Sequence, residues 1–117
     1  VDTVHGGDIT SGTIAHALDE RDPVATDVME RASYHLGIFT ASVVNAIDPA
    51  CVVYGGGLIE ACGGFMLPVI RDATYRHLIR PVDPQKLPIV AAALGDNAVV
   101  IGGAMLAQAA LAEREET

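Results

Sequence analysis

The feature that most constrains the fold is a short apolar run between two strong breaks in the chain. An Asp-Pro pair at 48–49 ends a helical pattern, CVVY at 51–54 follows it, and three glycines at 55–57 come next. An apolar run of this length bounded by turn residues is typical of a strand buried in a parallel sheet. The sequence therefore predicts an α/β fold with parallel strands and packed helices, in which one strand ends at a glycine turn.

Helical and strand-like segments alternate through the rest of the chain. The expected order is helix, helix, strand, helix, strand, helix, at about 12–20, 23–47, 51–54, 65–79, 87–94 and 98–111. Pro68 is expected in the first turn of its helix, where a proline ring is tolerated. The last helix is apolar on nearly every side and is expected to lie between other elements. One face of the second helix carries apolar residues at intervals of three or four and should pack on a sheet; these are Val28, Ala32, Leu36, Phe39, Val43 and Ile47.

The 117 residues are expected to form a single partial domain. Residues 1–11 are predicted to be a loop or linker, with Thr10 or Ser11 capping the first helix, and residues 112–117 a solvated tail. A parallel sheet of two strands with four apolar helices leaves strand edges uncovered. The missing strands are expected from an upstream part of the same polypeptide or from a partner chain, the alternative being a compact helical truncate. The chain starts at Val1 with no visible signal peptide, so we expect a fragment.

Charge and composition exclude several function classes. The net charge is −8, with Lys86 the only lysine and six scattered arginines, so direct nucleic-acid binding is not expected. Apolar runs are too short for the roughly 18 residues of a membrane span. Cys51 and Cys62 lack a metal-binding pattern, so no metal ligand is assigned, and we expect reduced core thiols of a cytoplasmic protein.

Three segments resemble the ROK family in order and spacing, from Ile9 to Ala110. They are ITSGTIAHALDERDPVATDVME, GIFTASVVNAIDPACVVYGGGLIEACGGFMLPVIRDA and LPIVAAALGDNAVVIGGAMLA. The resemblance implies an actin-like, ribonuclease-H-like ATPase fold that binds ATP with Mg²⁺ in a cleft between two domains and passes phosphate to a sugar hydroxyl. This chain would be the C-terminal, nucleotide-binding part of such a protein.

The resemblance also implies the cofactor-binding residues. They are Gly55, Gly56 and Gly57, which match the family's adenosine-contacting turn, and Leu58, which follows them. Glycine can adopt positive φ and lets a nucleotide approach the backbone, but any tight turn between a strand and a helix can use glycine for its conformation alone. Three further residues match the family: Asn45, Asp96 and Asn97. For these we expect a buried hydrogen bond or a helix cap rather than contact with a ligand.

The chain departs from the family by lacking its phosphate loop, its catalytic aspartate and its cysteine-rich zinc motif. No catalytic residue is therefore assigned, and the chain alone is not expected to transfer phosphate. Three hypotheses follow: a fragment of a sugar kinase acting on glucose or an N-acylated hexosamine, the effector and dimerisation part of a ROK repressor, or a structural module. The glycine turn favours the kinase. Apolar surface left uncovered should make the chain associate as a homo-oligomer.

Overall fold

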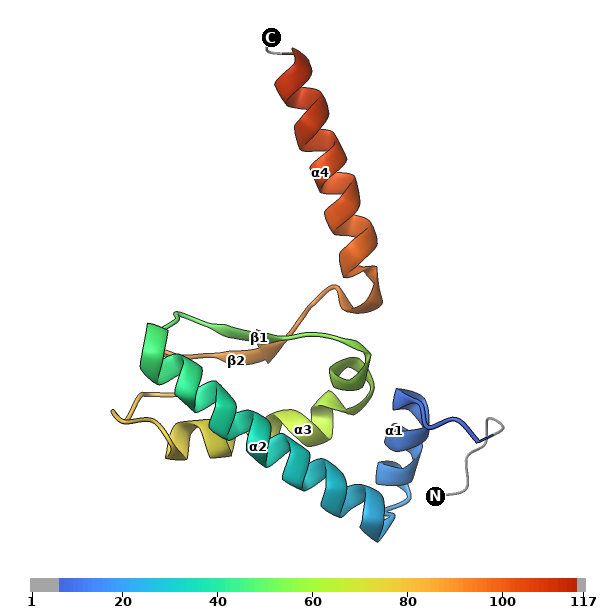
Figure 1. The fold of residues 1–117 in the computed structure, drawn as a ribbon, viewed down its shortest axis with the longest axis vertical. Helices are drawn as coiled ribbons and strands as arrows, with labels where there is room; N and C mark the ends of the chain where they lie inside the picture. Colours follow the sequence, from blue (N-terminus) through green and yellow to red (C-terminus); the bar gives the residue numbers. More distant parts are fainter. Residues whose placement is uncertain (1–6, 116–117) are drawn as a thin grey trace.

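The computed structural model describes residues 7–115, which form four helices, two strands and one short 3₁₀ helix. The order expected from the sequence is confirmed, and Figure 1 shows the arrangement. The elements are α1 (Ser11–Asp19), α2 (Pro23–Ile47), β1 (Val52–Tyr54), α3 (Gly57–Arg76), β2 (Ile89–Ala91), η1 (Gly95–Asn97) and α4 (Ala98–Glu115).

Both ends of the described chain are more helical than expected. Thr10 is the N-cap of α1, where its side chain accepts a hydrogen bond from the Thr13 amide, so Ser11 already belongs to the helix. Residues 1–6 of the expected loop lie outside the described residues. At the other end α4 runs to Glu115, so most of the expected tail is helical, as the strong helix propensity of alanine, glutamate and arginine favours. Residues 116–117 lie outside the described residues.

Helix α3 begins earlier than the sequence indicated. It starts at Gly57 and contains Pro68 in its interior, so the expected start near residue 65, with the proline in the first turn, is wrong. A mid-helix proline costs a backbone hydrogen bond. Burial of one face offsets this cost, because apolar side chains recur along α3 at helical spacing; they are Ile59, Cys62, Met66 and Ile70.

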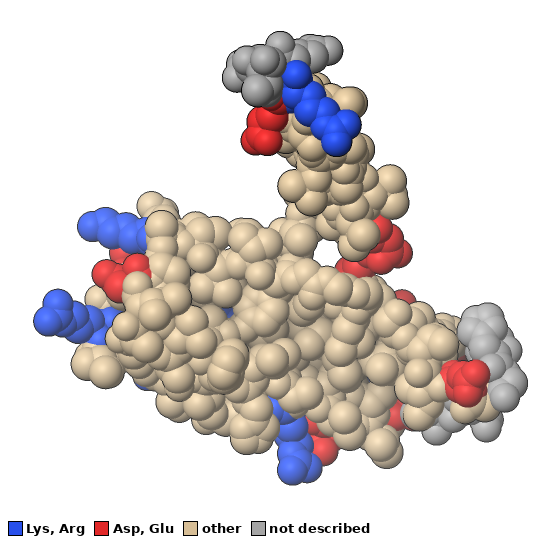
Figure 2. Space-filling view, turned by 45° about the horizontal axis from the view of Figure 1, so that its top comes forward, with Lys and Arg blue, Asp and Glu red and all other residues tan. Residues whose placement is uncertain are grey.

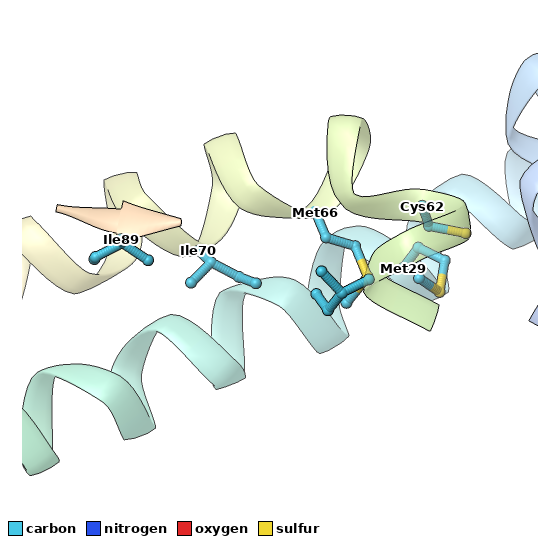
Figure 3. Packing of buried hydrophobic residues seen from close by; sticks show 6 residues of the cluster. Met29, Cys62, Met66, Ile70 and Ile89 are labelled. Carbon is cyan, nitrogen blue, oxygen red and sulfur yellow. The ribbon is translucent and has the colours of Figure 1, made fainter. Parts of the chain in front are cut away.

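The core lies between α2, α3 and the sheet. β1 and β2 pair in parallel, with Val52 opposite Ile89, and α3 packs against both α2 and β2. Figure 3 shows the buried side chains in a row from the strand to the two helices; the cluster is Met29, Ile59, Cys62, Met66, Ile70 and Ile89. Cys62 is therefore a core thiol as expected, whereas Cys51 is exposed, because it precedes β1 at the surface.

Helix α2 buries a different face from the one predicted. Its buried side chains are mostly small and allow a close approach to α3; they are Met29, Ser33, Gly37, Thr40, Ala41 and Val44. At Gly37 a β-carbon would lie 2.5 Å from the Ala73 β-carbon. The predicted stripe is largely exposed instead, with Val28 at 56% and Phe39 at 66%, so the expectation that it packs on the described sheet is wrong.

Helix α4 projects away from the other elements, as Figure 1 shows. Among the described elements it shares a substantial contact with η1 only, and its apolar side chains are exposed, including Val99 and Leu106. The radius of gyration is 18.2 Å, against about 13 Å for a compact domain of this length. The expectation that the last helix lies between other elements is therefore wrong for the described chain, because it contains nothing to cover it.

Candidate nucleotide groove

A groove of about 660 Å³ lies beyond the carboxyl ends of β1 and β2, beside the first turns of α3. Ligands of open α/β sheets bind at this end of the strands, and ligand pockets commonly have volumes of roughly 300–1,000 Å³. The sequence places a turn after each strand here, so the two turns and α3 form its walls. The lining residues are Tyr54, Gly55, Gly56, Ile59, Glu60, Gly63, Gly64, Leu67, Pro68, Arg71, Ala91, Ala92, Ala93, Leu94, Gly95 and Asn97.

Much of the groove wall is backbone and small side chains. Gly56 is the N-cap of α3 and has φ +104°, a conformation that residues with a β-carbon rarely adopt. At Gly64 a β-carbon would meet nothing within 4 Å, which leaves open space above α3. A flat molecule can therefore approach the backbone closely on this side of the groove.

Only two of the four cofactor-binding residues that the resemblance implied lie in the groove. Gly55 and Gly56 line the groove, whereas Gly57 and Leu58 are not among its lining residues. Gly57 is the first residue of α3, and a β-carbon there would lie 3.9 Å from the Ser11 hydroxyl oxygen. Leu58 is 37% exposed on the first turn of the helix.

Four polar side chains line the groove: those of Tyr54, Glu60, Arg71 and Asn97. The Tyr54 hydroxyl shares a hydrogen bond with the Thr40 hydroxyl of α2. Arg71 Nε donates a 2.7 Å hydrogen bond to the Ile89 carbonyl oxygen, which fixes the side chain between α3 and β2. Tyr54 and Arg71 are therefore held by their neighbours before any ligand arrives.

Glu60 connects the groove to the turn before α4. A hydrogen bond with the Asp96 side chain, and then the Asp96 charge, raise the pKa of Glu60 above its ordinary value. The turn is tight, because Gly95 has φ +51° and a β-carbon there would lie 2.8 Å from Glu60 Oε1. Asp96 thus favours the protonated form of Glu60 over that of an isolated glutamate.

The three further family matches have different positions. Asn45 has a structural role, as expected, although at an exposed site: its Nδ2 donates to the His77 carbonyl at 3.2 Å and its Oδ1 accepts from the Ile79 amide at 3.0 Å. Asp96 and Asn97 both lie in η1. Asn97 lines the groove, and Asp96 contacts Glu60 at its rim.

Residues 7–115 contain neither a cluster of metal ligands nor a membrane-spanning helix. No group of three or more His, Cys, Asp or Glu residues in this part of the chain is arranged to hold a metal ion. None of the described helices is both long enough and apolar enough to cross a membrane.

Sequence reasoning did not find Glu60, Arg71 or the Gly63–Gly64 wall of the groove. All of them lie on α3. The expected start near residue 65 left Glu60 and the glycine pair outside the helix, whereas Arg71 lay within the expected helix but was given no role. A helix starting directly after the glycine turn would have placed Glu60 in its first turn and Arg71 three turns further along. The spacing of apolar residues from Ile59 to Ile70 was the signal that pointed to this start.

A family model for the ROK family matches residues 3–110. The chain belongs to the ROK family. It is 33% identical over 100 residues to a glucokinase from Halalkalibacterium halodurans, covering 86% of this chain and 30% of the relative. It is 36% identical over 105 residues to the bifunctional enzyme NanE/NanK of Brucella melitensis, covering 88% of this chain and 18% of the relative.

Regulators are also among the ROK relatives. The chain is 30% identical over 104 residues to the DNA-binding transcriptional dual regulator NagC of Escherichia coli, covering 89% of this chain and 25% of the relative. The chain thus spans less than a third of the length of these curated relatives.

The structure resembles part of a solved protein assigned as a sugar kinase from Cytophaga hutchinsonii. The TM-score is 0.70 at 20% identity, covering 89% of this chain and 34% of that protein. The chain therefore has part of the α/β, actin-like ATPase fold that the resemblance to the family implied.

Proposed function

We propose that this ROK chain supplies the adenosine side of the ATP site of a sugar kinase, which phosphorylates a hexose hydroxyl and depends on parts of the ROK fold that this chain does not span. The groove beyond the two strand ends carries this proposal. Its glycine turn lets a nucleotide approach the backbone, and Gly56 needs its positive φ to begin α3. Glucokinases are among the relatives, which supports a hexose as the acceptor.

The lining residues of the groove fit a nucleoside better than a triphosphate. Small residues of α3 and of the segment after β2 form a wall on which a flat base can lie. Glu60 offers carboxylate oxygens that accept hydrogen bonds from ribose hydroxyls, and Asn97 offers both a donor and an acceptor. Carboxyl groups at the rim disfavour phosphates there, so the phosphates would extend away from Glu60 and Asp96.

Mg²⁺ would enter with the phosphates of ATP, where it neutralises charge during phosphoryl transfer. The described residues offer only the Glu60–Asp96 pair at the groove rim, and this pair is occupied with its own shared hydrogen bond. We therefore assign no metal ligand and no catalytic base to this chain. The kinase would act in the cytoplasm, where ATP is available.

Nucleotide binding by the chain tests the groove directly. ATP added to the ¹⁵N-labelled chain should shift the amide signals of Gly55 and Gly56. A leucine at position 64 would fill the open space above α3, so Gly64→Leu should weaken ATP binding about tenfold or more. Gly103→Leu is the matched control, because Gly103 is also a helical glycine with nothing within 4 Å of a β-carbon, but it lies on α4 away from the groove.

The two variants separate the possible outcomes. Loss of binding in Gly64→Leu alone supports the groove, whereas equal binding by both variants would place ATP elsewhere. Phosphorylation of a hexose panel completes the test: the chain alone should be inactive, and a ROK polypeptide that contains it should use ATP. Activity in neither would count against the kinase.

A second function is favoured by the NagC relationship. In a ROK repressor the same segment would belong to an effector and dimerisation part, with DNA bound elsewhere in the polypeptide. The identity to NagC over 89% of this chain supports this alternative. A chain that binds no nucleotide, within a polypeptide carrying a helix-turn-helix, would favour the repressor.

A further inference from the structure

The backbone groups of β2 point alternately toward β1 and away from it. The Val52 amide donates to the Pro88 carbonyl, and the Ala92 amide donates to the Tyr54 carbonyl, so positions 88 and 92 face β1. The paired positions of a parallel ladder alternate, so the amides and carbonyls of the odd-numbered residues face the opposite way. We call this side of the strand the β2 outer edge. Helix α3 packs against β2, and the groove lies beside both.

Two side chains of α3 occupy the start of the β2 outer edge. The Tyr75 hydroxyl donates a 2.8 Å hydrogen bond to the Leu87 carbonyl, and Arg71 Nε donates its 2.7 Å hydrogen bond to the Ile89 carbonyl. The donors are four residues apart in a helix and the acceptors two residues apart along the strand, which is a rise of about 6–7 Å in both elements. The two elements therefore stay in step, and an added strand could pair with these carbonyls only by displacing the side chains of α3.

The series stops at Ala91, the next residue that faces outward. One helical turn before Arg71, α3 carries Leu67 and Pro68, and neither side chain has a hydrogen-bond donor. Within residues 7–115, no hydrogen bond to the outward amide or carbonyl of Ala91 is present. Ala91 is exposed and lines the groove. One backbone donor and one backbone acceptor therefore open into the groove side by side.

We propose that Ala91 reads the base of the nucleotide: its carbonyl accepts a hydrogen bond from the 6-amino group of adenine, and its amide donates one to the ring nitrogen beside that group. Adenine carries this amine donor next to a ring-nitrogen acceptor, which complements the acceptor and the donor of one extended residue. The inference rests on the proposed function, because it takes the groove as the nucleotide site and names the residue that selects adenine there.

The surroundings of Ala91 suit a flat ring. At Gly64, one turn before Pro68 on α3, a β-carbon would meet nothing within 4 Å, so one face of the base can rest on the helix. Glu60 lies four residues before Gly64 and therefore on the same face of α3. A ribose bound by Glu60 and a base bound by Ala91 would thus be neighbours along the groove.

The charges around the groove favour a neutral group at this place. Figure 2 shows acidic side chains where α4 joins the rest of the molecule. They would repel an anion, whereas a base amine and ribose hydroxyls are neutral donors. Among the described residues that line the groove, Arg71 is the only one with a cationic side chain, and its Nε is already bonded to the Ile89 carbonyl. The base and the ribose therefore fit this part of the groove better than the phosphates do.

Hydrogen exchange in the wild-type chain tests the contact at the amide. Saturating ATP should slow exchange of the Ala91 amide about tenfold or more, because this amide gains a hydrogen-bond partner. The Val53 amide is the internal reference. Its neighbours Val52 and Tyr54 face β2, so Val53 faces the other edge of the sheet, and its exchange should stay as in the free chain.

A series of nucleotides tests the contact at the carbonyl. Purine riboside triphosphate has a hydrogen atom in place of the 6-amino group of ATP, and inosine triphosphate has an oxygen atom there. Both keep the ribose and the phosphates of ATP, but neither offers an amine that donates to the Ala91 carbonyl. Each should bind about tenfold more weakly than ATP, because the carbonyl is left without a partner. Titration calorimetry with the wild-type chain measures the three affinities.

A pair of variants tests the amide independently. Ala91→Pro removes the amide that faces the groove and should weaken ATP binding about tenfold. Val53→Pro is the matched control, because it removes an outward amide from the other edge of the sheet and should bind ATP as the wild-type chain does. Circular dichroism checks that both variants fold. If Ala91→Pro does not fold, the nucleotide series, which needs no substitution, decides the proposal.

The outcomes separate this inference from the proposed function. Protection of the Ala91 amide by ATP, together with a preference for ATP over both analogues, supports the inference. If ATP shifts the Gly55 and Gly56 signals but binds no more tightly than the analogues, or leaves exchange at Ala91 unchanged, the inference is overturned and the proposed function stands. Equal loss of ATP binding in the two folded proline variants would also overturn the inference. A chain that binds no ATP would overturn both.

Discussion

Replacing Gly37 by alanine should destabilise the chain, although alanine is the better helix former. Gly37 lies where α2 crosses α3, and a β-carbon there would lie 2.5 Å from the Ala73 β-carbon and 2.7 Å from the Ile70 carbonyl oxygen. Carbon atoms in contact sit about 3.5–4.0 Å apart, so the helices would have to separate by about 1 Å or more. The Ile70 obstacle is backbone and cannot rotate away.

The energetic balance follows from two opposing effects. Alanine in place of glycine gains about 0.5–1 kcal/mol within a helix, whereas overpacking a core typically costs about 1–3 kcal/mol. Separation of the helices also lengthens the 3.1 Å hydrogen bond from the Thr74 hydroxyl to the Gly37 carbonyl. A net loss of about 1–2 kcal/mol in the free energy of unfolding is expected.

Urea unfolding followed by circular dichroism at a fixed chain concentration measures this change. Gly64→Ala is the matched control, because Gly64 lies on the exposed side of α3 with nothing within 4 Å of a β-carbon, and the variant should unfold at a higher urea concentration than wild type. Equal stability of Gly37→Ala and Gly64→Ala would show that α2 and α3 do not cross this closely in solution.

Three more outcomes follow from described contacts. Asn45→Ala removes both hydrogen bonds to the turn after α3 and should cost about 1 kcal/mol, measured by urea unfolding, whereas Asn45→Asp should lose less because it keeps the acceptor for the Ile79 amide. Asp96 raises the pKa of Glu60, so the stabilisation linked to Glu60 is complete below the ordinary glutamate pKa and is lost as the pH rises through the raised value. An NMR titration of Glu60 in Asp96→Asn should show a lower pKa than in wild type. An unchanged pKa would contradict the pairing. Burial, and then the Asp19 charge, raise the pKa of the Cys62 thiol, so at neutral pH iodoacetamide should modify exposed Cys51 rapidly and Cys62 only after unfolding, as mass spectrometry of the peptides would report.

The order of helices and strands could be predicted because local signals agreed with one another. Pro23 and Asp48 delimit α2, and the apolar run before the glycines marks β1. The start of α3 could not be read in the same way. Gly63, Gly64 and Pro68 all disfavour a helix interior, and burial of α3 against α2 overrides that preference.

The buried face of α2 was mispredicted for a related reason. The periodicity of large apolar residues indicates which face of a helix is buried in the complete fold. In the described chain, however, α2 packs against α3, and this close contact requires small residues. Gly37 and Ser33 permit the close packing with α3, while Phe39 remains exposed. The error therefore marks a surface that needs a partner outside the described fold.

The site could be predicted in part. The glycine turn is visible in the sequence, and the structure brings Gly55 and Gly56 to the groove. Glu60 and Arg71 depend on where α3 begins and on how it rests against β2, which no local pattern specifies. Binding of nucleotide by the glycine turn stays a prediction.

The projecting helix α4 has a consequence for how the chain unfolds. A single helix of 18 residues is only marginally stable in water, and α4 receives substantial support only from η1 among the described elements. Its amides should therefore exchange with solvent long before those of α2 and α3, which protect each other. The molecule thus consists of two units of unequal cooperativity, and melting of α4 should leave the groove wall formed by α3 folded.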